Sequence, residues 1–207
     1  MTHQLLFVQG GGSGTHDNWD KKLVESLERE LGPDYAVRYP RMPHEADPAY
    51  ARWKAALTRA FARLGDGAMV VGHSIGGTIL LRTLADEPAR VPFGGIFLIA
   101  APFVGKGGWE SEDIASLADV GRSLPEQTPI FLYHGRNDHT APVKHLQLYA
   151  RAIPRAIVRR LAGRDHQLNS DLAVVAADIR SSHVTARRRS RRSRETYRRR
   201  RLAGATV

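Results

Sequence analysis

The octapeptide spanning residues 70–77 constrains the fold of this 207-residue chain more than any other stretch. It reads Val-Val-Gly-His-Ser-Ile-Gly-Gly, an apolar strand that passes through a turn into a helix, with Ser74 at the tip. Gly72 and Gly76, two residues before and after the serine, meet a steric requirement, because strand and helix pass close together there. The pattern G-x-S-x-G predicts a sharp turn that lifts the Ser74 hydroxyl above the edge of a sheet.

Apolar, strand-like runs alternate with amphipathic helical segments along most of the chain. The expected strands are residues 4–9, 36–39, 68–71, 94–100, 130–133 and 156–161. A short helix is expected near residues 111–120, and a last helix over residues 172–179. This alternation predicts an α/β fold with a mostly parallel sheet of about six strands and helices on both faces.

Composition excludes several classes of protein. The chain has no cysteine, so it can form neither a disulfide framework nor a thiolate nucleophile. Its histidines are scattered without metal-ligand spacing, and we expect neither a metal nor a cofactor. The first residues lack the pattern of a secretory signal, and no apolar run approaches the roughly 18 residues that a membrane span needs. We therefore expect a soluble cytoplasmic protein.

The basic character belongs to the end of the chain. Residues 187–201 hold ten arginines and one glutamate, which supply +9 of the formal net charge of +10 and leave +1 for the rest. We expect two parts, a folded domain over residues 1–182 and a disordered Arg-rich tail over residues 183–207. Such a tail could bind nucleic acid or an anionic membrane; we favour the interpretation that it is a solvated extension.

Two later strands end in the residues that a catalytic serine would need. A serine hydroxyl is a weak nucleophile that requires a base, and the base requires an orienting carboxylate. Asp138 follows the expected strand 130–133, and His166 follows the expected strand 156–161. Because carboxyl ends of parallel strands meet at one edge of a sheet, we assign Ser74 as nucleophile, His166 as base and Asp138 as orienting acid. Asp165 is an alternative acid.

A glycine-rich loop after the first strand completes the expected site. The amide of Ile75, just after the serine, is one expected donor to an oxyanion. The loop of residues 9–14 should supply another, and Gly11 and Gly12 are the candidates. The loop lacks the sequence of a phosphate-binding loop. Four further side chains are expected to rim the same edge and shape a substrate pocket: His16, Trp19, Phe103 and Trp109.

Six stretches together resemble the small α/β hydrolases of the retinoblastoma-binding protein nine type: residues 7–10, 39–43, 71–77, 100–103, 137–143 and 165–169. The resemblance implies a compact α/β-hydrolase fold without a large lid and a triad of Ser74, Asp138 and His166. It also implies hydrolysis of small esters or related acyl compounds. The Arg-rich end departs from the family pattern.

Two functions follow as expectations. The first is a serine hydrolase that acts on a small-molecule ester or acyl substrate through an acyl-enzyme on Ser74. The second is a catalytically weak α/β-hydrolase domain that serves as a binding module, tethered by its basic tail. Ester, amide and thioester substrates stay open, because all three can use the same triad.

Overall fold

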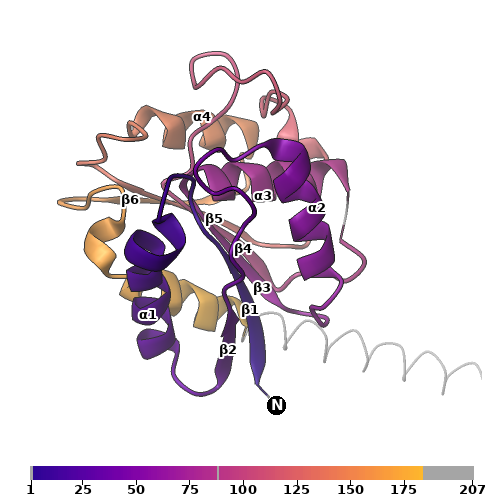
Figure 1. Cartoon of the computed structure of the whole chain (residues 1–207), viewed down its shortest axis with the longest axis vertical. Helices are drawn as coiled ribbons and strands as arrows, with labels where there is room; N and C mark the ends of the chain where they lie inside the picture. The colour runs from indigo at the N-terminus through magenta and orange to yellow at the C-terminus, as the bar shows by residue number, and fades with distance from the viewer. Residues whose placement is uncertain (1, 88, 184–207) are drawn as a thin grey trace, which may run out of the picture.

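The computed structural model describes residues 2–87 and 89–183. Its centre is a parallel six-stranded sheet with the strand order β2-β1-β3-β4-β5-β6 (Figure 1). The predicted fold class is confirmed, and each expected strand is present within a few residues. The strands are β1 (His3–Val8), β2 (Tyr35–Arg38), β3 (Met69–His73), β4 (Gly95–Ile99), β5 (Ile130–Gly135) and β6 (Ile157–Leu161).

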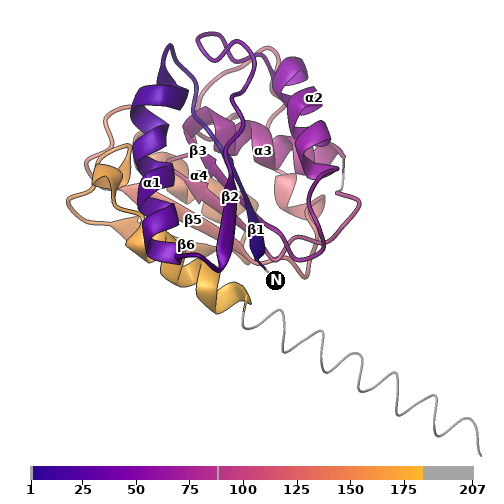
Figure 2. The same ribbon diagram turned by 60° about the horizontal axis from the view of Figure 1, so that its bottom comes forward.

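Helices cover both faces of the sheet (Figure 2). One face carries α1 (Asp20–Leu31) and a last helix described over residues 173–183. The other carries α2 (Tyr50–Phe61), α3 (Ser74–Asp86) and α4 (Lys144–Ala152). Within the described residues, none of the helices has the length and apolar character to cross a membrane.

The two apolar cores follow from the alternation of side chains along buried strands. Val70 packs with the core under α2, α3 and α4, whereas its neighbours Met69 and Val71 pack with the core under α1. All residues of β3 and β4 are buried, as expected for central parallel strands covered on both faces.

The strand order places a topological switch between β1 and β3. From β1 the chain crosses outward to β2, and it then returns to β3 on the other side of β1. In open parallel sheets, the loops at such a switch separate and leave a crevice outside the carboxyl ends of the strands. The Ser74 turn and the glycine loop after β1 both lie at this point.

One expected element is absent. No α-helix forms near residues 111–120; a single 3₁₀ turn over Val120–Arg122 follows a bent segment instead. The Ser111 hydroxyl accepts from the Ile114 amide at 3.0 Å and donates to Asp113 at 2.9 Å, which favours a local turn over a helix. The proposed Arg-rich tail lies outside the described residues except for His183.

Candidate active site

The turn between β3 and α3 holds Ser74 in a strained backbone conformation. Its φ angle is +52°, in the left-handed region that residues with a Cβ rarely adopt. The glycines around Ser74 lie at positions where a side chain would clash with its neighbours. A Cβ on Gly72 would lie 2.5 Å from the Cα of Gly77, and one on Gly76 would clash with the carbonyl of Gln9. The close approach of strand and helix that the sequence predicts is therefore present.

A continuous chain of hydrogen bonds links Ser74, His166 and Asp138. The Ser74 hydroxyl lies 3.0 Å from Nε2 of His166, and the opposite ring nitrogen, Nδ1, lies 2.8 Å from Oδ2 of Asp138. Since an ionised carboxylate only accepts, Nδ1 carries the proton and Nε2 accepts from the serine. All three residues are buried. The structure thus brings the three predicted residues together in the geometry of a nucleophile, its base and an orienting acid.

The surroundings of His166 favour its neutral form. Burial lowers the pKa of His166 below its ordinary value, and the positive charge of His73 acts in the same direction. The hydrogen bond from Nδ1 to Asp138 opposes these effects without overcoming them. A neutral imidazole at neutral pH has a free lone pair on Nε2, as a general base requires.

Asp138 is held as an anion by a set of donors. Burial alone would raise its pKa, but hydrogen bonds from His134 and His166, with the Ala141 amide, hold the pKa well below its usual value. Its Oδ1 accepts from the amides of Thr140 at 2.9 Å and Ala141 at 2.8 Å, and His134 Nε2 lies 3.1 Å from Oδ2. Sequence reasoning missed His134, whose only signal was its place at the end of the same strand.

The alternative acid, Asp165, does not contact the histidine ring in this structure. It is exposed, and its Oδ1 accepts from the Asn169 amide at 2.7 Å within the turn that carries His166. The Asp165 amide in turn donates to the Asn169 side chain at 3.0 Å. Asp165 therefore shapes the loop, whereas Asp138 contacts the ring.

The expected oxyanion donors differ in their availability. Ile75 is the second residue of α3, so its N–H has no acceptor one turn back within the helix. Gly11 lies against the Ile75 side chain, and none of the hydrogen bonds described for residues 2–87 and 89–183 uses its amide. The Gly12 amide donates to the Glu45 carbonyl at 2.6 Å, and the Gly10 amide donates to a carboxylate. The amides of Ile75 and Gly11 are therefore the two expected donors that these hydrogen bonds leave available.

Glu45, which the sequence analysis did not single out, holds this glycine loop in place. Its carboxylate accepts from the Gln9 side chain at 2.5 Å and from the Gly14 and His16 amides, each at 3.0 Å. Burial would raise the pKa of Glu45, but these hydrogen bonds lower it below its usual value. A lone acid in a loop carries no periodic signal, so only the long-range contacts reveal its role.

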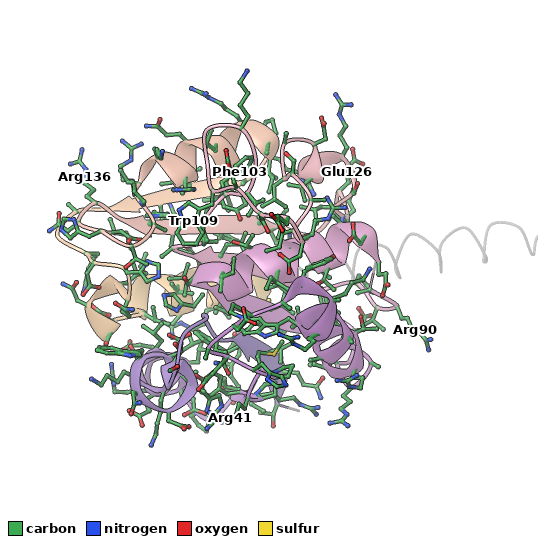
Figure 3. All side chains as sticks on the ribbon, turned by 45° about the horizontal axis from the view of Figure 1, so that its top comes forward. Arg41, Arg90, Phe103, Trp109, Glu126 and Arg136 are labelled. Carbon is green, nitrogen blue, oxygen red and sulfur yellow. The ribbon has the colours of Figure 1, made fainter. Side chains whose placement is uncertain are left out.

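The four expected pocket residues fall into two groups. His16 stacks on Tyr39 with ring centroids 4.2 Å apart, and Trp19 is 53% exposed. Phe103 and Trp109 share the loop after β4, where the Trp109 amide donates to the Phe103 carbonyl (Figure 3). In the part of the chain that the structure describes, no hydrogen bond or ring contact joins any of the four to the triad.

We also searched the described residues for metal-binding clusters and for cavities away from Ser74. Within residues 2–87 and 89–183, no group of three or more histidines and carboxylates could hold a metal ion. A cavity of about 270 Å³ lies between the end of α3 and the segments that precede β4 and β5, lined in part by Leu84, Phe93 and Thr128. It is at the opposite ends of those strands from Ser74 and takes no part in the site.

The sequence and the fold both match known proteins. A family model described as "Alpha/beta hydrolase family" matches residues 5–207. A search among curated proteins found no match.

Three solved structures illustrate the likeness in fold. The ydeN gene product of B. subtilis is 20% identical, with a TM-score of 0.70 over 89% of this chain and 100% of that one. The esterase domain of a Rhodothermus marinus protein is 22% identical, with a TM-score of 0.63 over 90% and 87%. Est1E from Butyrivibrio proteoclasticus, solved with ferulic acid bound, is 13% identical, with a TM-score of 0.63 over 88% of each chain.

Proposed function

This chain belongs to the alpha/beta hydrolase family, and we propose that it is a serine hydrolase that cleaves small carboxylic esters through an acyl-enzyme on Ser74. One observation carries the proposal: the unbroken hydrogen-bond chain from the Ser74 hydroxyl through His166 to Asp138 at the carboxyl edge of the sheet. The esterase domain of the same fold from Rhodothermus marinus supports the choice of ester substrates. The six sequence stretches that resemble the retinoblastoma-binding protein nine type support a place in that subgroup.

In the acylation step, Ser74 Oγ attacks the ester carbonyl carbon while His166 Nε2 takes the hydroxyl proton. The carbonyl oxygen becomes an oxyanion, which accepts hydrogen bonds from the amides of Ile75 and Gly11. One such donor is worth about 3 kcal/mol of barrier. When the tetrahedral intermediate collapses, the bond to the alcohol oxygen breaks and His166 returns its proton to that oxygen. The alcohol leaves, and the acyl group remains on Ser74.

Deacylation repeats these roles with water as the nucleophile. His166 removes a proton from the water, whose oxygen attacks the acyl carbon. Collapse breaks the bond to Ser74 Oγ, and His166 gives the proton back to the serine. Throughout, the Asp138 carboxylate stabilises the imidazolium that forms twice per turnover, and it keeps the proton of Nδ1 in place.

The proposal can be tested with a fluorophosphonate probe, which labels only an activated serine. We expect stoichiometric labelling of the wild-type chain and turnover of p-nitrophenyl acetate, both lost in Ser74→Ala. Ser123→Ala, which alters an exposed serine at the end of the Val120–Arg122 turn, should behave as wild type. A folded wild-type protein that neither labels nor turns over the ester would instead indicate the second function, a binding module.

A further inference from the structure

A second histidine–carboxylate pair lies directly behind the proposed triad. His73, the last residue of β3, and Asp20, the first residue of α1, are both almost fully buried. Both oxygens of the Asp20 carboxylate lie 2.9 Å from Nδ1 of His73. On the other side of the ring, Nε2 lies 3.1 Å from the backbone carbonyl oxygen of His166. Neither residue has a role in the mechanism above.

The partners of the ring indicate its charge. A neutral imidazole has one N–H and one lone pair, but both nitrogens of His73 face atoms that only accept, a carboxylate and a carbonyl. Both contacts are hydrogen bonds only if the ring carries two protons. Burial alone would lower the pKa of His73, yet the charge and hydrogen bond of Asp20 outweigh it and raise the pKa above its ordinary value. These contacts favour a buried imidazolium–carboxylate pair.

The pair joins three segments that are far apart in the sequence. Asp20 Oδ2 also accepts from the Gly10 amide at 2.6 Å, in the loop that carries the oxyanion donor Gly11. Gly10 itself lies against the Ser74 side chain, since a Cβ added there would be 3.1 Å from Ser74 Cβ. His73 is the residue before Ser74, and its other nitrogen holds the loop of His166. The oxyanion loop, the nucleophile and the base are thus connected through one ion pair.

We propose that Asp20 and His73 are positioning residues that set the relative placement of the oxyanion loop, Ser74 and His166. This inference rests on the proposed function, because it assigns a role within the same reaction. The pair transfers no proton and contacts no reacting atom; it acts through the Gly10 amide and the His166 carbonyl. A displacement of about 1 Å between reacting groups can lower a rate on the order of 10²-fold. A pair that fixes these positions therefore has a large effect on turnover.

The same pair also acts on the base through its charge. The rings of His73 and His166 are 4.9 Å apart between centroids, and the positive charge of His73 lowers the pKa of His166. The other groups that face His166 are Asp138, which raises its pKa, and His134, which lowers it. His73 is faced by Asp20 and Asp138. Removing the charge of His73 should therefore raise the pKa of His166.

The charge state can be measured without any catalysis. In the full-length wild-type protein, ¹⁵N spectra of the histidine side chains should show His73 with both ring nitrogens protonated at pH 7.5, assigned by loss of the signals in His73→Gln. In Asp20→Asn the ring should become neutral at that pH. A neutral His73 in the wild-type protein would overturn the proposal.

Kinetics test the positioning role. We expect Asp20→Asn and His73→Gln to lower kcat for p-nitrophenyl acetate on the order of 10²-fold, with retained circular dichroism. In both variants, the acid limb of the profile of kcat/KM against pH should move to higher pH, because the positive charge of His73 no longer lowers the pKa of His166. Asp119→Asn, an exposed carboxylate, should match wild type. An unshifted acid limb together with unchanged kcat would overturn the proposal.

These outcomes separate the two proposals. If the wild-type chain neither labels with fluorophosphonate nor turns over the ester, the proposed function fails, while the ¹⁵N spectra still decide whether the buried ion pair exists. If the wild-type chain is active and His73 is neutral, only the positioning proposal fails.

Discussion

At the scale of single residues, Asp138 is the group whose chemistry can be changed with the least change in shape. Asp138→Asn keeps a side chain of the same size, but its amide can donate to Nδ1 of His166 and so stabilises the wrong tautomer. We expect kcat for p-nitrophenyl acetate to fall by about 10⁴-fold. Asp165→Asn is the matched control, because the Asp165 side chain contacts Asn169 and not the ring; it should retain wild-type turnover. If the two variants exchanged these behaviours, Asp165 would be the orienting acid.

The residues of the hydrogen-bond chain could be predicted because each follows a strand. Ser74, Asp138 and His166 each follow an apolar run that marks the end of a strand in the sequence. In a parallel sheet the carboxyl ends of the strands lie at one edge, so these positions are close together. Asp20, Glu45 and His134 act through contacts that carry no local signal. The Asp20–His73 pair joins α1 to β3 across 53 residues. Such pairings depend on how the elements pack, which sequence patterns within one element do not contain.

At the scale of structural elements, Glu45 holds the glycine loop of residues 9–14, which we propose to carry an oxyanion donor. Glu45→Gln replaces one carboxylate oxygen by an NH₂ group, which must face at least one of the donors from Gln9, Gly14 or His16. We expect the loop to shift and kcat to fall by about tenfold or more, since each oxyanion donor matters to the barrier. Labelling of Ser74 by fluorophosphonate should be slowed, not abolished.

The control for Glu45 is its neighbour Asp47, whose side chain is 93% exposed. Asp47→Asn should leave turnover and labelling at the wild-type level. Wild-type kcat in a folded Glu45→Gln protein would contradict a role of Glu45 in holding the loop.

The short helix expected near residues 111–120 does not form. Ile114, Leu117 and Val120 recur every three residues, as on one face of a helix, and all three are buried. Their backbone nevertheless follows a bent path that long-range bonds hold: the Leu117 amide donates to the Val104 carbonyl at 2.9 Å, and Asp113 accepts from the Tyr50 amide at 2.7 Å. Apolar spacing predicts which residues are buried more reliably than it predicts the local backbone when tertiary partners satisfy the peptide groups.

At the scale of the whole molecule, the response of stability to acid follows from the ion pairs. Among residues 2–87 and 89–183, five carboxylates have pKa values lowered by salt bridges and hydrogen bonds: Asp17, Glu45, Asp86, Asp138 and Asp171. Burial lowers the pKa of His145 and His166 as well. In each case the unfolded chain binds protons at a higher pH than the folded chain does, so the free energy of unfolding should decrease as the pH falls.

The histidines and the carboxylates lose their contributions to the free energy of unfolding in different pH ranges. The histidine contribution should begin to disappear below the ordinary histidine pKa of 6.5, and the carboxylate contribution below about pH 5. His73 acts in the opposite sense, because its raised pKa stabilises the fold most at low pH. His73 stabilises the fold in acid, whereas two histidines and five carboxylates lose their stabilising contribution there. The free energy of unfolding therefore decreases overall as the pH falls. We therefore expect Tm, followed by circular dichroism, to decrease from pH 7 to 8, as the contribution of the protonated His73 is lost, and to fall steeply below pH 5. Below pH 5 the slope of Tm against pH should be smaller in Asp138→Asn, which lacks one of the titrating groups. A Tm that stayed constant down to pH 3 would contradict the assignment of these carboxylates as anions in the folded protein.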